Sequence, residues 1–162
     1  MPWEIDTEGA DDAERAIQRL IVGLRDLRSF WPSVVPLFIG WMRRQFETQG
    51  GYGGQPWAPL SAEYAAWKAA RYPGRGILVA EGDLRQAASR PERRVTPSTL
   101  TLSIDWAGTK GQPVDLRWHQ EGNSDMPARP LLFDQLPLSA RIELEDVAED
   151  YVRDLARRLG LR

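Results

Sequence analysis

The hydrophobic residues of the chain recur with a helical period near both ends of the sequence and with a period of two in its middle. This change of period restricts the fold strongly, because each pattern places apolar side chains on one face of a helix or of a strand. Residues 11–30 predict a first helix, and residues 33–49 predict a second one with Ser33 as its N-terminal cap. The break at residues 31–33 is short, so the two helices are expected to form an antiparallel pair.

Two further helices are predicted after this pair. A short helix over residues 61–70 has Ser61 as its cap, and a longer helix covers about residues 143–159. Acidic residues fill the first half of the longer helix and arginines fill its last turn, which matches the direction of the helix dipole. Residues 50–59 are rich in glycine, which predicts a loop between the second and third helices.

The middle of the chain has the alternation of a β-sheet. Residues 100–106 place apolar side chains on one face and polar ones on the other, which predicts a half-buried strand. Residues 93–95 and a turn at 96–98 complete a hairpin, and residues 114–119 predict a further strand. We therefore predict one α+β domain over residues 1–162, in which an antiparallel β-sheet with a hairpin is packed by the N-terminal helix pair and the C-terminal helix.

The composition argues against several classes of protein. The net charge of -2 disfavours a protein whose main task is gripping nucleic acid, because phosphate binding needs an excess of basic residues. There is no cysteine, which excludes disulfides, and no apolar run approaches the ~20 residues of a membrane span. The acidic N-terminal stretch lacks the pattern of a signal peptide, so assembly in the cytoplasm is expected. Seven tryptophans in 162 residues indicate that some of them lie between subunits.

His119 is the single histidine of the chain and the first candidate for chemistry. Glu121 and Asp125 are close to it in sequence, but their spacing matches no familiar ligand set. A structural or interface role is therefore favoured over a metal ligand or a catalytic base. No nucleophile motif and no phosphate-binding loop is present. The sequence predicts a protein that is not an enzyme and that uses no cofactor or metal.

A run of arginines around the predicted hairpin is the one basic feature of the chain, and it includes Arg90, Arg93 and Arg94. Charges of this kind protect the edge of a sheet from pairing with a stray strand. The same run can also dock an acidic partner subunit or contact DNA. These three interpretations remain open, and the solvated hairpin edge is favoured.

Several short motifs follow one another along the middle of the chain. Over residues 46–159 their order and spacing resemble the phage virion-morphogenesis family, which includes tail-completion and head-tail joining proteins. Glu81 departs from the family pattern, which has threonine there, and Arg117-Trp118 replaces the usual Tyr-Ala pair. In chain order the motifs are Trp57-Ala-Pro-Leu-Ser61 with Tyr64 and Lys68, then Ile77-Leu78, Gly82-Asp83-Leu84, His119-Gln-Glu-Gly122 and Ala128-Arg129-Pro130.

The resemblance implies a structural subunit that completes the tail and joins it to the head as a ring in the neck. The implied partners are further copies of the chain in a six-fold ring, a tail terminator or tail tube protein, and the connector proteins of the head. DNA passes only through the lumen, and no membrane is involved. The implied location is the virion, after assembly in the host cytoplasm. Two alternatives are a tail terminator or another connector ring, and a small nucleic-acid-binding regulator.

The motif residues and the arginines together supply the expected subunit contacts. Trp57 is expected to anchor the glycine-rich loop, and Gly82 to supply a left-handed backbone angle where a turn enters the sheet. Arg129 lies on a stiff segment suited to an ion pair or a subunit contact. Alanine at Trp57 or Arg129 is expected to leave a folded monomer that no longer joins head to tail. The expected interface residues are Trp57, Arg90, Arg93, Arg94, His119 and Arg129.

Overall fold

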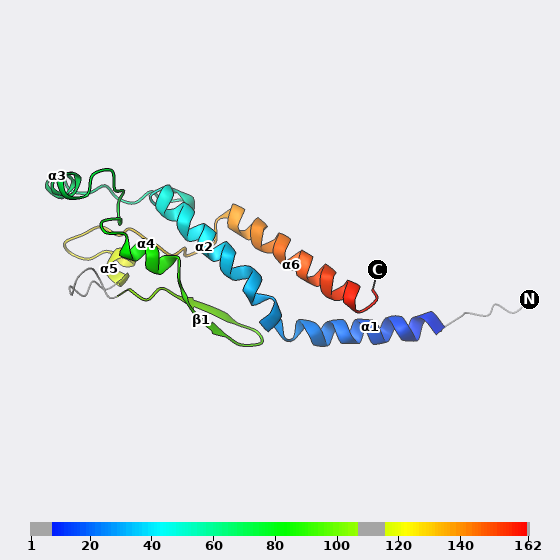
Figure 1. The fold of residues 1–162 in the computed structure, drawn as a ribbon. Coiled ribbons are helices and arrows are strands. Elements are labelled where there is room, and N and C mark those ends of the chain that lie inside the picture. The colour runs from blue at the N-terminus through cyan, green and yellow to red at the C-terminus, as the bar shows by residue number, and fades with distance from the viewer. Residues whose placement is uncertain (1–7, 107–115, 162) are drawn as a thin grey trace, which may run out of the picture.

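The computed structural model describes residues 8–106 and 116–161, without the side chains of residues 8–11. The molecule is elongated, and the helices α3, α4 and α5 lie at the end opposite the start of α1 (Figure 1). The long helices are α1 (Glu8–Leu24), α2 (Trp31–Glu47) and α6 (Leu138–Arg158). The short elements are the 3-10 turns η1 (Leu27–Ser29) and η2 (Gly51–Gly53), the helices α3 (Ala62–Arg71), α4 (Asp83–Ala88) and α5 (Leu116–Glu121), and the strands β1 (Glu92–Val95) and β2 (Leu100–Ser103).

The helices α2 and α6 lie side by side and antiparallel along the molecule (Figure 1). Ala140 is completely buried, so a small side chain permits close packing near the start of α6. The carboxylate of Glu143 accepts hydrogen bonds from Trp41 Nε1 at 2.8 Å and from Arg44 Nη2 at 2.6 Å. Both predicted segments are confirmed as helices, although α6 begins at Leu138, earlier than the sequence pattern indicated. The predicted cap at Ser33 is wrong, because α2 begins at Trp31 and Ser33 lies inside the helix.

Glu143 should make the stability of the chain depend on pH. The hydrogen bonds from Arg44 and then from Trp41 favour the ionised carboxylate and hold the pKa of Glu143 below its usual value. A lowered pKa stabilises the folded state above the pKa of the unfolded chain, and this contribution is lost as the pH falls through the folded pKa. Between about pH 6 and pH 3, Glu143→Gln is expected to lose less stability than the wild-type chain. Urea denaturation at both pH values measures this, and equal losses would contradict the role of Glu143.

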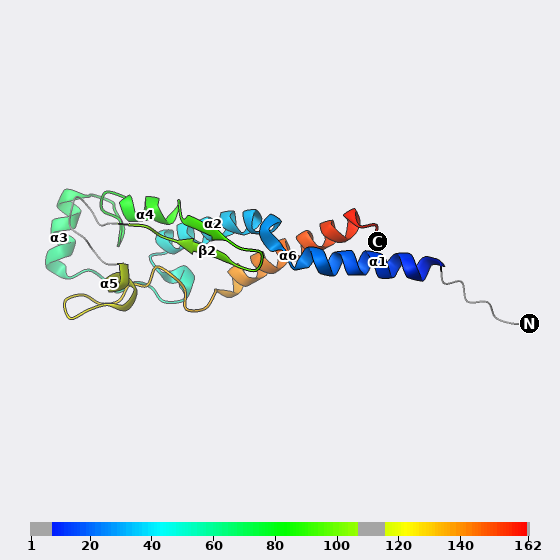
Figure 2. The same ribbon diagram turned by 90° about the horizontal axis from the view of Figure 1, so that it is seen from below.

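The predicted antiparallel pairing of the first two helices is wrong. The helix α1 runs on from α2 as an extension of the molecule, and it contacts α6 instead (Figures 1 and 2). Gly23 permits this contact, because a Cβ atom at that position would lie 3.0 Å from Leu155 Cδ2. The short break between α1 and α2 contains η1, which bends the chain without reversing it.

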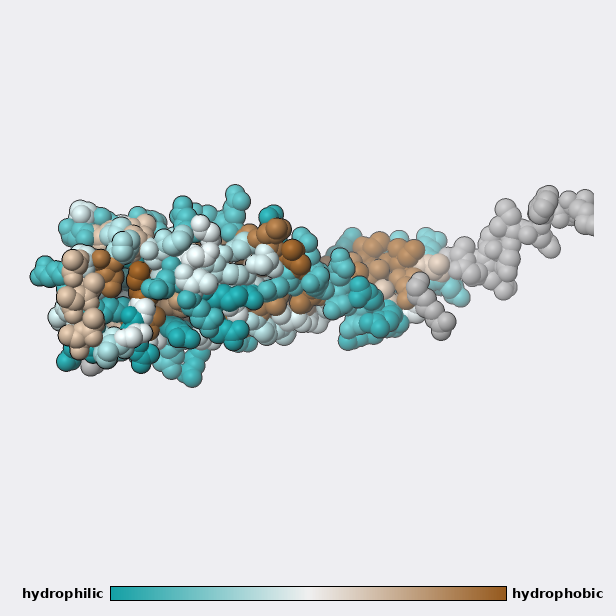
Figure 3. Space-filling model, turned by 90° about the horizontal axis from the view of Figure 1, so that it is seen from above, coloured by the Kyte–Doolittle hydropathy of each residue, from teal (hydrophilic) through white to brown (hydrophobic). Residues whose placement is uncertain are grey.

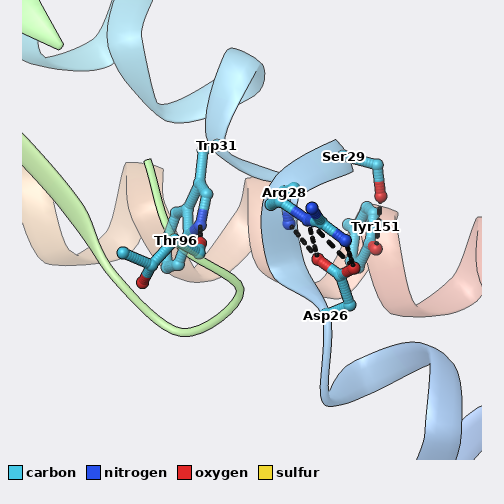
Figure 4. Close-up of polar contacts among 6 residues, drawn as sticks. All are labelled: Asp26, Arg28, Ser29, Trp31, Thr96 and Tyr151. Carbon is cyan, nitrogen blue, oxygen red and sulfur yellow. Dashed lines mark hydrogen bonds and ion pairs between the residues drawn. The ribbon is translucent and has the colours of Figure 1, made fainter. Parts of the chain in front are cut away.

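The corner between α1 and α2 is held by side chains from distant parts of the chain (Figure 4). Asp26 accepts a hydrogen bond from the backbone of η1 at 3.1 Å and so caps this turn. Ser29 and Tyr151 share a hydrogen bond of 2.8 Å, and Trp31 Nε1 donates to the backbone oxygen of Thr96 at 3.0 Å. The corner is therefore fixed against both α6 and the turn of the β-hairpin.

The described part of the chain contains one sheet, the antiparallel hairpin of β1 and β2. Glu92 pairs with Ser103 and Val95 with Leu100, so the predicted hairpin and the α+β class are confirmed. All four side chains of β1 are exposed, which makes the hairpin peripheral. The prediction that the helices pack on a sheet is therefore wrong, because the buried core lies elsewhere.

The further strand predicted over residues 114–119 is wrong where the structure describes it. Residues 114 and 115 lie outside the described residues, and Leu116 begins the helix α5. Leu116, His119 and Gln120 are spaced for one helical face, and all three are partly buried. Gln120 accepts from the backbone nitrogens of residues 131 and 132 at 3.0 Å, which fixes this helix against a distant loop.

The buried core lies between α2, α4 and the segments that follow η2 and α5. Gly82 has a φ of +101° as expected, but it begins the helix α4 and does not enter the sheet. Among the described helices, none is long and apolar enough to cross a membrane. The core residues are Met42, Phe46, Trp57, Val79, Leu84, Ala88 and Leu131.

Candidate functional site

A cavity of about 550 Å³ lies at the end of the molecule where α3, α4 and α5 meet. Its apolar wall includes Leu60, Tyr64, Leu78 and Trp106. Two buried cations, Lys68 and Arg129, line it together with His119, and exposed carboxylates lie at its rim: Glu81, Asp83 and Asp125. The cavity therefore combines an apolar wall with two buried cations, which suits an amphipathic ligand.

Arg129 is built into the wall of this cavity and is only 7% exposed. Its Nε donates to the backbone oxygen of Ala58 at 2.8 Å, and its Nη2 donates to that of Pro59 at 3.0 Å. Its own backbone nitrogen donates to the oxygen of His119 at 2.6 Å. Burial lowers the pKa of Arg129 from its ordinary value, because the charged form is poorly solvated. The guanidinium thus ties the segment of Arg129 to residues 58–59 through backbone oxygens, and no ion pair to it is found among the described residues.

Lys68 is the second buried cation of the cavity and is 4% exposed. Its position on α3 turns the side chain inward, where Nζ donates to the backbone oxygen of Gly76 at 2.5 Å. Burial and then the charge of Arg129 lower the pKa of Lys68 from its ordinary value. Ser61 caps α3 by accepting from the backbone nitrogen of Tyr64, as the sequence predicted, and this cap fixes the start of the helix that carries Lys68.

His119 faces the same cavity from α5, with its ring centroid 5.8 Å from that of Trp106. Its Nδ1 atom is buried and has no hydrogen-bond partner in the part of the chain that the structure describes. Burial and then the charge of Arg129 lower the pKa of His119 from its ordinary value, which favours the neutral imidazole. No cluster of three potential metal ligands is found among the described residues.

Trp57 lies behind the cavity in the core and is 4% exposed. Its indole Nε1 donates to the backbone oxygen of Pro130 at 2.8 Å, and its ring meets that of Phe46 edge to face at 5.5 Å. Gln45 Nε2 donates to the same oxygen of Pro130 at 3.0 Å. The expected anchoring role of Trp57 for the glycine-rich loop agrees with this burial, and the indole also joins the two motif segments at residues 57–60 and 128–130.

The remaining expected interface residues lie apart from the cavity. Arg90 follows α4, Arg93 and Arg94 are on β1, and all three side chains are exposed. The structure therefore brings together His119, Arg129 and, behind them, Trp57, while the arginines belong to the peripheral hairpin. The sequence identifies Lys68 only as a motif position, since a lysine between Trp67 and Ala69 on a short helix carries no sign of burial.

Comparison with protein-family models, with curated proteins and with solved structures gave no match for the chain. The proposals below therefore rest on the geometry of the site and on the motif order in the sequence.

Proposed function

We propose that the chain is a structural subunit of a phage neck, which completes the tail and joins it to the head as a ring without catalytic turnover. The observation that carries this proposal is the convergence of the motifs that resemble the virion-morphogenesis family. The segments at 57–60 and 128–130 meet through the bonds of Trp57 and Arg129, and His119 and Lys68 face the adjoining cavity. Motifs spread over the middle of the sequence thus form one structural unit.

The shape of the molecule supports assembly with other subunits. The helix α1 extends away from the buried core (Figure 1). Apolar side chains are exposed on two helices, including Ile17 and Val22 of α1 and Leu138 and Ile142 of α6. Figure 3 shows an apolar patch over the projecting part of α1. Exposed apolar surface of this kind is typical of contact sites between proteins.

The proposed assembly is a six-fold ring through which DNA passes. Its partners are the tail terminator or tail tube protein on one side and the head connector on the other. The exposed arginines of the hairpin are available for an acidic partner, because none of the three is buried within the chain. Heterologous contacts between identical subunits close into a ring when the rotation divides a full circle.

Light scattering and negative-stain images of the same chromatographic peak test the ring, and closed rings of uniform size are expected. If the purified chain is a monomer, binding to purified tails becomes the deciding measurement. Failure of both assays would overturn the proposal. Binding to duplex DNA that weakens steeply with salt would instead favour a nucleic-acid-binding regulator.

The hairpin arginines are expected to contribute to binding on the tail or connector. Replacing Arg93 and Arg94 together with glutamine should weaken this binding about tenfold, an effect worth ~1.4 kcal/mol. Thermal unfolding should stay unchanged, because both side chains are exposed. The control is the double variant Arg141→Gln, Arg158→Gln on α6, which makes the same charge change on another exposed surface. Equal weakening in the two variants would show that net charge alone matters.

A further inference from the structure

The cavity contains two buried cations, and no buried carboxylate lines it among the residues that the structure describes. Lys68 and Arg129 are 4% and 7% exposed, and their charged groups donate to backbone oxygens only. No carboxylate forms an ion pair with either side chain within residues 8–106 and 116–161. Buried charges are usually compensated by an opposite charge, since desolvation strongly disfavours an isolated ion. An anion placed in the cavity would offset this excess of positive charge.

Acidic side chains are present at the cavity, but they do not compensate the buried cations. Glu81, Asp83 and Asp125 line it, and all three residues are solvent-exposed. Neither Lys68 nor Arg129 has its pKa raised by any of these carboxylates. Water and salt screen exposed charges, so the rim opposes an incoming anion only weakly. The apolar part of the wall, which includes Leu60, Leu78 and Trp106, can accept an aliphatic or aromatic neighbour of the anion.

Residues 1–14, which precede α1 and include its start, have a composition complementary to that of the cationic cavity. Residues 1–14 contain six carboxylate side chains and no lysine or arginine. Trp3 and Ile5 alternate with Glu4 and Asp6, so apolar and acidic side chains are adjacent in this stretch. The ligand that fits a cationic cavity with an apolar wall is an acidic peptide of this composition.

A protomer cannot place this stretch in its own cavity. The helix α1 starts at the end of the molecule opposite α3 and α5 (Figures 1 and 2). The helices α1 and α2 have 17 residues each, which corresponds to about 25 Å of length per helix. Seven extended residues reach about 25 Å, roughly half of that combined length. The acidic stretch therefore has to meet the cavity of another copy.

We propose that the cavity of one protomer binds residues 3–8 of a neighbouring copy, with a carboxylate of that segment at Lys68 and Arg129. The cavity and the start of α1 lie at opposite ends of the elongated molecule, so a contact between the two would be heterologous, as a ring requires. This inference rests on the proposed function, because the occupant is a second subunit. The proposed contact would link neighbouring subunits of the ring. The motif resemblance by itself identifies no such contact.

The first test uses a synthetic peptide of residues 1–14 and the full-length chain carrying Glu4→Gln, Asp6→Asn and Glu8→Gln. These substitutions neutralise the chain's own acidic segment and leave the cavity unchanged. His119 is the only histidine of the sequence, so its Hε1 resonance is a unique probe of the cavity. The peptide is expected to move this resonance and to bind by fluorescence anisotropy. A peptide with the same three neutralising substitutions should bind at least about tenfold more weakly.

A cavity variant provides the second arm of the test. Lys68→Met removes the buried charge and keeps an unbranched apolar side chain, so thermal unfolding is expected to be unchanged or raised. The same variant should weaken binding of the acidic peptide about tenfold or more. If Lys68→Met unfolds, the charge dependence is still measured by comparing the acidic and the neutralised peptides, because that comparison leaves the cavity unchanged. Sodium acetate should compete only at concentrations far above that of the peptide.

The outcomes separate the inference from the proposed function. No shift of the His119 resonance, or equal binding of acidic and neutralised peptides, would overturn the proposed occupant. Acetate that binds as tightly as the peptide would show a site for small carboxylates and overturn the assignment to residues 3–8. Rings or tail binding without peptide binding would refute the inference alone. If the peptide binds in a manner that depends on Lys68, but neither rings nor tail binding is observed, the neck function is refuted and the peptide-binding site still stands.

Discussion

Replacing Trp57 with alanine is expected to lower the free energy of unfolding by about 3–5 kcal/mol. The indole is 4% exposed, contacts Phe46 edge to face, and donates a hydrogen bond to the backbone oxygen of Pro130. Its removal leaves a cavity in the core and takes one of two donors from that oxygen, since Gln45 also donates to it. Urea denaturation followed by circular dichroism measures the loss.

The matched control for this prediction is Trp67→Ala on α3. Trp67 is 51% exposed, and its ring lies against those of Tyr64 and Tyr72, both of which are at least partly exposed. Its replacement should cost less than about 1.5 kcal/mol. Similar losses for the two tryptophans would contradict the placement of Trp57 in the core. A large loss at Trp57 also revises the expectation of a folded alanine monomer, so assembly is better tested at the hairpin arginines.

Replacing Gly50 with alanine is expected to destabilise the chain by about 2–5 kcal/mol. Gly50 precedes η2 with a φ of +91°, a backbone conformation that disfavours residues with a side chain. A Cβ atom there would also lie 2.6 Å from the backbone oxygen of Gln55 and 2.6 Å from Trp57 Cδ1. The substitution therefore combines an unfavourable backbone angle with a direct clash against the buried indole.

Gly54 separates these two contributions, because it follows η2 with a similar φ of +87° and has no atom within 4 Å of the position of a Cβ. Gly54→Ala should cost only about 1–2 kcal/mol, which is the contribution of the backbone angle. Thermal and urea denaturation of both variants give the difference that belongs to the clash at Gly50. Equal destabilisation of the two variants would show that the loop moves away from Trp57 without cost.

The local elements of this fold were largely predictable from the sequence. The apolar stripes of α1, α2 and α6, the cap of α3 at Ser61 and the hairpin of β1 and β2 depend on residues a few positions apart. Two short helices escaped prediction. The alternating Val114, Leu116 and Trp118 resembled a strand, although Leu116 begins α5. The helix α4 has only six residues, too few for a helical period to show.

The candidate site was predictable only in part. His119, Arg129 and Trp57 were named from motif order, yet nothing in the sequence placed Arg129 against the backbone of Ala58. The burial of Lys68 was equally hidden, because a lysine at such a position is usually solvated. These features depend on segments about 70 residues apart in the chain, as the hydrogen bonds of Arg129 and Trp57 show.

The sequence by itself determined that α1, α2, α3 and α6 are helices, that β1 and β2 form a hairpin, and that α3 begins after Ser61, because caps and apolar periods act over one or two turns. Only the tertiary structure decided that α1 packs on α6, that the hairpin lies outside the core, and that Lys68 and Arg129 share one cavity. The physical reason is that a local pattern fixes which face of an element is apolar, whereas the partner of that face depends on packing between segments far apart in the chain.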